Sequence, residues 1–103
     1  MKPYFYHGSI NSALRARIAS NEPQFQATMR AGVEAFGGNL IRCHLLASTS
    51  GDPIGFLEFP EDIVARSWNA FYASQEGVLS STIKRLLDET DLAEMHRLIE
   101  QIS

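Results

Sequence analysis

Residues 39–59 read NLIRCHLLASTSGDPIGFLEF, and this stretch predicts two β-strands joined by a short turn. Residues 39–47 and 53–59 are rich in Leu, Ile and Phe, which favour extended structure. Residues 48–52 between them are polar and contain Gly51 and Asp52, which is typical of a hairpin turn. We therefore expect an antiparallel pair of strands at the centre of the chain.

A helix is predicted on each side of this hairpin. Before it, Asn21 and Pro23 form a helix-start signal, because Asn caps free amides and Pro fits the first turn. Apolar residues then recur every three or four positions until Gly37, which ends the helix. After the hairpin, Pro60 opens a second helix whose apolar stripe includes Trp68.

The ends of the chain complete the pattern. Residues 3–9 predict a first strand, residues 11–19 a short helical segment and residues 78–87 a last strand. Asp91 and Glu94 could form a capping box for a final helix. The apolar residues of that helix are Leu92, Met95, Leu98, Ile99 and Ile102. The order β-α-β-β-α-β predicts a ferredoxin-like α+β fold: a four-stranded antiparallel sheet, both main helices on one face, and a C-terminal helix.

Composition excludes several classes of function. The 103 residues fit one domain spanning 1–103, and the net charge of −3 with scattered Lys and Arg argues against a nucleic-acid partner. Cys43 is the only cysteine, so no internal disulfide is expected. No apolar run approaches the ~18 residues that a membrane span needs, and the first residues do not resemble a signal peptide. We expect a cytoplasmic protein without a membrane partner.

The strands carry apolar residues on both faces. Leu40, Ile41, Ile54, Phe56 and Leu57 do not alternate cleanly with polar residues. Two helices can cover only one side of such a sheet, and a large exposed apolar face is unusual on a monomer. We therefore expect a homodimer that pairs through the open sheet face. The alternative is that the C-terminal helix folds back over that face within one chain.

The hairpin offers a candidate ligand site. A register that avoids placing a lone carboxylate among apolar side chains pairs Arg42 with Glu58, His44 with Phe56, and Leu46 with Ile54. Arg42, His44 and Glu58 would then share the open face. Arg42 could hold an anionic group while His44 acts as acid or base. The other interpretation is a cross-strand ion pair between Arg42 and Glu58 at the dimer contact.

Three further residues are tentative members of a ligand site. Tyr4 and Tyr6 could line a cleft, although aromatic residues of a first strand commonly belong to the core. Asp52 could bind a ligand, or it could form the turn by bonding to its own backbone. Cys43 is interpreted as a small core residue. No residue spacing indicates a metal or cofactor, and no catalytic residue is assigned.

Several segments are similar to those of the GYD-domain family of small proteins. They are residues 34–38 (EAFGG), residues 56–62 (FLEFPED), and the pair Gly77 and Val78. The chain departs from the motif that names the family, because residues 49–52 read TSGD and keep only the Asp. The resemblance implies a ferredoxin-like fold related in shape to the dimeric α/β-barrel proteins. It implies no established activity.

Three functions remain open on the sequence alone. The first is a homodimeric small-molecule-binding or regulatory domain without catalysis. The second is a cofactor-independent isomerase or oxygenase acting on a small apolar or aromatic substrate, an argument from fold alone. The third is a structural subunit that only assembles with itself. A pocket between sheet and helices that holds His44 would favour the enzyme.

Overall fold

The computed structural model describes residues 1–49 and 51–102. Its elements are β1 (Lys2–Ile10), α1 (Ser12–Ser20), α2 (Glu22–Ala35), β2 (Asn39–Leu46), β3 (Asp52–Phe59), α3 (Asp62–Ala73), β4 (Val78–Arg85) and α4 (Glu89–Ile102). Every predicted strand and helix is present, with ends displaced by one to three residues. Ser50, which belongs to the predicted turn, lies outside the described residues.

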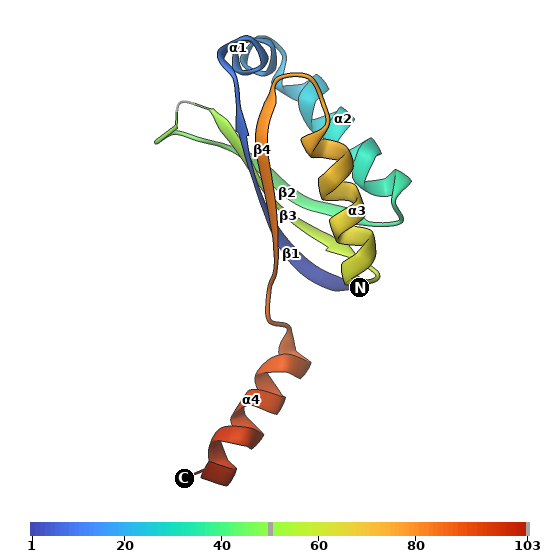
Figure 1. The fold of residues 1–103 in the computed structure, drawn as a ribbon, viewed down its shortest axis with the longest axis vertical. Helices are drawn as coiled ribbons and strands as arrows, with labels where there is room; N and C mark the ends of the chain where they lie inside the picture. The colour runs from blue at the N-terminus through green and yellow to red at the C-terminus, as the bar shows by residue number, and fades with distance from the viewer. Residues whose placement is uncertain (50, 103) are drawn as a thin grey trace.

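The strands form one antiparallel sheet in the order β2-β3-β1-β4. Helices α2 and α3 both lie on one face of it, and α1 crosses one end (Figure 1). The prediction of an α+β ferredoxin-like arrangement with an added C-terminal helix is confirmed. We call the face that α2 and α3 leave uncovered the open face.

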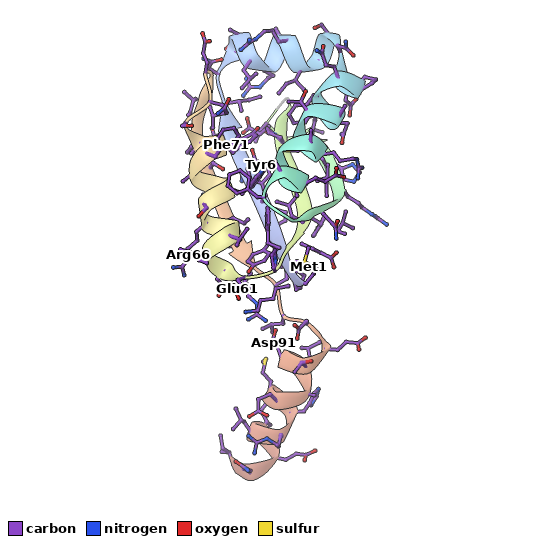
Figure 2. All side chains as sticks on the ribbon, turned by 90° about the vertical axis from the view of Figure 1, so that its right-hand side faces the viewer. Met1, Tyr6, Glu61, Arg66, Phe71 and Asp91 are labelled. Atoms are coloured by element: carbon purple, nitrogen blue, oxygen red, sulfur yellow. The ribbon has the colours of Figure 1, made fainter. Side chains whose placement is uncertain are left out.

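Aromatic side chains fill the space between the sheet and the helices. Tyr6 and Phe59 point from the central strands toward Trp68 of α3, with ring centroids 5.1 and 5.7 Å from the indole. All three side chains are almost fully buried. Figure 2 shows Tyr6 and Phe71 between the two helices. Burial of these rings is the main apolar contribution to stability on this face.

The predicted start and end of α2 are confirmed. The Asn21 side chain accepts a hydrogen bond from the backbone N–H of Gln24, and Pro23 lies in the first turn. At the other end Gly37 has φ of 77°, and the N–H of Gly38 donates to the carbonyl of Val33. This left-handed glycine turns the chain directly into β2.

The predicted cap of the last helix is wrong by one helical turn. Asp88 and Asp91 form the reciprocal pair: the Asp88 carboxylate accepts from the Asp91 N–H at 2.8 Å, and Asp91 accepts from the Asp88 N–H at 3.0 Å. The helix therefore begins at Glu89. The Glu94 carboxylate instead pairs with Arg97 on the same helix. Arg85 favours the earlier start, because it also binds Asp91.

The predicted pairing of the hairpin is wrong by two residues. Arg42 lies opposite Phe56, not Glu58, and His44 lies opposite Ile54. Glu58 lies opposite Asn39. Side chains alternate with a period of two, so this shift leaves Arg42, His44 and Glu58 on the open face, as expected.

Two local features set the observed register. Ile41 is an extra residue that forms a bulge between Leu40 and Arg42. Gly51 has φ of 124° and donates its N–H to the carbonyl of Leu46 at 2.8 Å, which closes the hairpin early. Neither a bulge nor the length of a turn is specified by a hydrophobic pattern.

The last helix does not fold back over the open face. After β4 the chain continues straight past the end of the sheet, and α4 extends away from the domain (Figure 1). The molecule is correspondingly long, with principal extents of 53 × 30 × 21 Å. The open face is therefore not covered by this chain's own tail.

All three tyrosines of the chain titrate above the usual range. Burial, followed by the hydrogen bond to Asp62, raises the pKa of Tyr4 from 10.0 to about 12. Burial also raises the pKa of Tyr6 and of Tyr72. A raised pKa means that the folded state holds the proton more tightly. The resulting stability is complete below the pKa of 10.0 and is lost as the pH rises toward about 12.

We therefore expect all three tyrosines of the folded protein to ionise above their ordinary pKa of 10.0. In an alkaline titration followed by tyrosinate absorbance and circular dichroism, ionisation and loss of structure should occur together. Tyr4→Phe should remove one of three tyrosinate signals from that transition. A tyrosine that ionises near pH 10 while the circular dichroism stays native would contradict the buried placement of these hydroxyls.

Candidate functional site

The open face has an apolar centre and polar edges. Residues directly opposite in an antiparallel pair share a face, so the register defines rows across the sheet. From β2 to β4 these rows are Arg42, Phe56, Phe5 and Lys84, and then His44, Ile54, His7 and Thr82. The inner strands supply two Phe, an Ile and His7, and the outer strands supply the cations Arg42 and Lys84 in the first row and the polar residues His44 and Thr82 in the second. An apolar strip with cationic margins results.

The aromatic pair at the centre is accessible. Phe5 and Phe56 contact each other with ring centroids 5.6 Å apart and planes inclined by 57°. Phe56 is 39% exposed even though it lies on a central strand. Such a ring would normally be covered, which indicates that this surface meets another molecule.

A hollow of about 420 Å³ lies at one end of this strip. Its lining residues are Pro3, Tyr4, Ile41, Arg42, Phe56, Leu57, Glu58 and Leu86. Three of the predicted site residues, Tyr4, Arg42 and Glu58, therefore line one concavity with Phe56. The walls are mostly apolar, and the two charges lie at its margin.

Arg42 and Glu58 do not form the ion pair that was the other interpretation of these residues. The Glu58 carboxylate accepts instead from the Asn39 side chain at 3.4 Å. Among the described residues, no ion pair holds the Arg42 guanidinium. The observed register is the cause, because it places Phe56 opposite Arg42 and Asn39 opposite Glu58. Arg42 is thus available to bind an anion.

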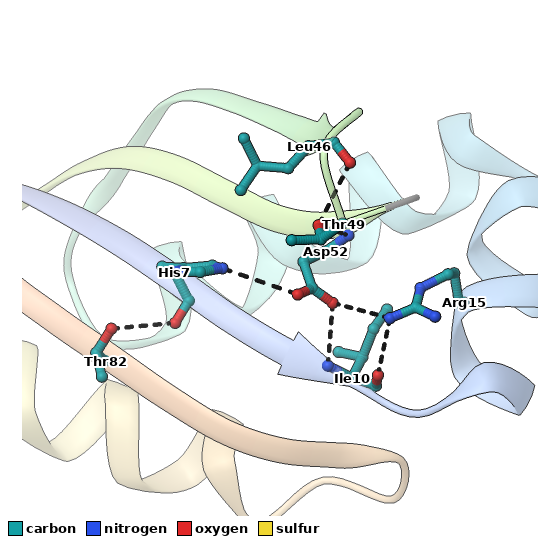
Figure 3. A network of polar contacts seen from close by, with 7 residues as sticks. All are labelled: His7, Ile10, Arg15, Leu46, Thr49, Asp52 and Thr82. Carbon is teal, nitrogen blue, oxygen red and sulfur yellow. Dashed lines mark hydrogen bonds and ion pairs between the residues drawn. The ribbon is translucent and has the colours of Figure 1, made fainter.

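The opposite end of the strip holds a cluster around Asp52 (Figure 3). One Asp52 oxygen, Oδ1, accepts the backbone N–H of Ile10 at 3.3 Å and the Arg15 guanidinium at 3.2 Å. Arg15 also donates to the carbonyl of Ile10 at 3.2 Å. Asp52 is buried, so its charge depends on these partners. Asp52 thereby fastens β3 to the end of β1 and to α1.

This geometry corrects the prediction that Asp52 bonds to its own backbone to form the turn. The Asp52 backbone N–H does contribute to the turn, because it donates to the Thr49 hydroxyl at 3.1 Å. Its carboxylate, however, reaches across the sheet to Ile10 and Arg15. The β1–β3 ladder ends at the pair His7 and Ile54, and the side chain supplies an acceptor beyond that point.

His7 completes the cluster, and the sequence analysis missed it. Its Nε2 lies 3.9 Å from Asp52 Oδ2, and its side chain is 40% exposed. Nε2 itself is buried and makes no hydrogen bond among the described residues. Strand alternation could have placed His7 on the open face, since its neighbours Tyr4 and Tyr6 point inward. Nothing in the sequence, however, indicates that Arg15 approaches Asp52.

Tyr4 and Tyr6 lie apart from this cluster, on the helix side of the sheet. Both are buried, and the Tyr4 hydroxyl donates to the Asp62 carboxylate at 2.5 Å. Tyr6 packs edge-to-face on Trp68. The six predicted site residues therefore do not form one cluster: Arg42, His44, Glu58 and Asp52 are on the open face, and these two rings support the core.

Cys43 is buried, in agreement with its interpretation as a core residue. Burial raises the pKa of its thiol to about 11, so at neutral pH it remains protonated and unreactive. His44 follows it on the strand and is exposed on the other side of the sheet.

A second cavity lies between the two main helices. It measures about 410 Å³, and its lining residues include Phe25, Met29, Trp68, Phe71 and Tyr72. It is lined by aromatic residues, as the enzyme hypothesis expects, but it lies between the two helices and not between the sheet and the helices. His44 is on the far side of the sheet, so this cavity contains no candidate acid or base from the predicted set.

The described residues form neither a metal-binding cluster nor a membrane-spanning helix. No group of three or more His, Cys, Asp or Glu within residues 1–49 and 51–102 is arranged to hold a metal ion. In the same part of the chain, no helix combines the length and apolar character required to cross a bilayer.

Removing the Asp52 carboxylate should destabilise the fold. Asp52→Ala leaves the Ile10 N–H without its acceptor and Arg15 without its ion pair, so we expect the free energy of unfolding to fall by about 1–3 kcal/mol. Asp52→Asn keeps an acceptor oxygen and should have a smaller effect. Urea denaturation measures both.

The matched control is Glu94→Ala, which breaks an exposed ion pair on α4. That change should have little effect on stability, because solvent screens exposed pairs. Equal losses for Asp52→Ala and Glu94→Ala would show that Asp52 does not fasten the strands as described.

Comparison with known proteins finds no family model that matches this chain and no curated protein that matches it. The resemblance to the GYD-domain family accordingly stays a prediction based on the segments quoted above.

Proposed function

We propose that this protein is a homodimeric, non-catalytic domain that binds a small acidic molecule with an apolar body on its open sheet face. The observation that carries this proposal is the apolar strip of Phe5, Phe56 and Ile54 between cationic edges. It places an accessible aromatic surface beside an arginine without an ion pair.

The chemistry of the hollow supports an acidic ligand. Its volume of about 420 Å³ falls within the roughly 300–1,000 Å³ typical of small-molecule sites. The Arg42 guanidinium presents a planar set of donors that suits a carboxylate. The Phe56 ring beside it suits the flat apolar part of the same molecule. Glu58 at the margin would disfavour a ligand with a second negative charge nearby.

The uncovered strip supports pairing with a second copy. Phe56 and Ile41 are 39% and 52% exposed, and α4 leaves both uncovered within the chain. Two-fold pairing through one shared surface is the commonest way in which proteins cover such a face. A ligand in the hollow would then be shielded from water between the two chains.

A second candidate function rests on His7. An imidazole whose nitrogen faces a buried carboxylate is the arrangement of an oriented general base, and His7 stands in that relation to Asp52. A cofactor-independent isomerase acting on an apolar substrate could use it. Turnover of a bound ligand that His7→Gln abolishes, without loss of binding, would favour this function over simple binding.

Light scattering on the full chain should report twice the chain mass of 11.5 kDa. We expect thermal-shift screening with benzoate, phenylacetate and indole acetate to raise Tm by several degrees at concentrations well above Kd, since ligands stabilise the state that binds them. Arg42→Ala should remove that shift, and His44→Ala should weaken it.

Arg66→Ala provides the matched control, because Arg66 is an arginine of α3 on the helix side of the sheet. It should leave the ligand shift unchanged. A shift that survives both Arg42→Ala and His44→Ala would place the ligand elsewhere, and a mass of 11.5 kDa at all concentrations would exclude the dimer.

A further inference from the structure

Helix α4 carries an apolar stripe that faces solvent. Leu92, Met95, Leu98 and Ile102 recur at helical spacing and are 45%, 44%, 46% and 88% exposed. Polar and charged residues occupy the other side of the helix. A stripe of this kind is the face by which a helix packs onto another surface.

The direction of α4 is fixed where it leaves the sheet. Arg85, near the end of β4, binds Asp91 at 2.7 Å and Asp88 at 3.6 Å. The reciprocal cap of Asp88 and Asp91 closes the first turn. The N–H of Leu86 also donates to the carbonyl of Pro3 at 2.9 Å, which keeps the connection beside β1. These bonds aim the helix away from its own domain.

A helix in this position needs support from another molecule. It has 14 residues, and isolated helices shorter than ~12–15 residues are marginal in water. Most helical stability in proteins comes from packing of the apolar side. Since α4 extends away from its own sheet and helices, these elements do not provide that packing.

Charge indicates which surface of the second chain α4 fits. Residues 88–102 carry five carboxylates and one arginine, a net charge of −4, whereas the whole chain carries −3. Residues 1–87 therefore carry +1. Two copies of residues 88–102, each with a net charge of −4, would repel each other, so pairing of α4 with α4 is disfavoured. The open face, with Arg42 and Lys84 at its edges, attracts an acidic helix.

We propose that the α4 helix of each chain lies on the open face of a second copy, so that two chains exchange helices. This inference rests on the proposed dimer and names the element that covers the apolar strip. The stripe of Leu92, Met95 and Leu98 packs against Phe56 and Ile54 of the partner. The acidic residues of the helix lie toward the cationic edges of the sheet.

The dimensions are compatible with this exchange. A helix of 14 residues is about 21 Å long. A strand of 8 residues such as β3 is about 26 Å long, so one helix covers most of the strip. A two-fold axis near the end of β4 directs each helix back along the partner's strands. Both open faces are then covered by one symmetric contact.

The first test introduces the same charge on the two sides of α4. Leu98→Glu places a carboxylate in the proposed contact, and Gln101→Glu places it on the polar side. We expect Leu98→Glu to raise the dimer dissociation constant more than about tenfold in sedimentation equilibrium, and Gln101→Glu to change it little. Equal dissociation constants for the two variants would overturn the exchange.

The second test traps the contact by mild oxidation. Full-length Met95→Cys chains are mixed with longer, tagged Ile54→Cys chains, and disulfide products are separated by size. The native Cys43 does not compete, because its buried thiol has a pKa of about 11. A 95–54 product supports the exchange, and Gln101→Cys in place of Met95→Cys should give none. Products of 95–95 or 54–54 alone would overturn it.

These results separate the inference from the proposal on which it rests. A wild-type monomer would remove both the dimer and the exchange. A wild-type dimer that resists Leu98→Glu and gives no 95–54 product would retain the proposed dimer and reject α4 as its cover. A ligand shift that Arg42→Ala removes while the dimer dissociation constant stays unchanged tests the binding site separately from assembly.

Discussion

The indole of Trp68 joins α3 to both central strands, because it packs against Tyr6 of β1 and Phe59 of β3. Tyr72, one turn later on the same helix, extends the contact onto Tyr6. The aromatic volume of the domain is thereby concentrated on one side of the sheet. Among residues 1–49 and 51–102, α1 crosses only one end of the sheet and α4 leaves it, so neither helix covers the other side. The open face follows from this one-sided core.

The position of His7 depends on a structural contact that is remote in sequence. Asp52 fastens the start of β3 to Ile10 and Arg15, and His7 lies one row away on the same face. The Asp52 carboxylate holds the strands together and also faces the His7 imidazole, so its main role is structural. Any chemistry at His7 would use the Asp52 carboxylate, whose position is already set by its structural contacts. For this reason the cluster is weaker support for an enzyme than Arg42 is for a binding site.

The sequence predicts this fold well because its hydrophobic pattern agrees with the residues that begin and end its helices. Asn21, Pro23 and Gly37 mark α2 within a residue, and strand alternation places Arg42 and His44 on the correct face. What could not be predicted depends on contacts between distant residues or on single backbone angles. The bulge at Ile41 changes the register. The ion pair of Arg15 with Asp52 spans 37 residues, and no local pattern encodes it. The resemblance to the GYD-domain family likewise remains a prediction.

The two uncovered surfaces of the chain have complementary chemistry. The open face is apolar with cationic edges, and α4 is apolar with acidic flanks. In a monomer, both apolar surfaces would stay exposed to water, which would lower solubility and add nothing to stability. Within one molecule they do not meet, because α4 extends away from its own sheet (Figure 1), in the direction that Arg85, Asp88 and Asp91 support. Between two molecules they can meet twice at once, and the same contact would shelter the hollow beside Arg42 from water. Assembly and ligand binding would then be linked through a single surface.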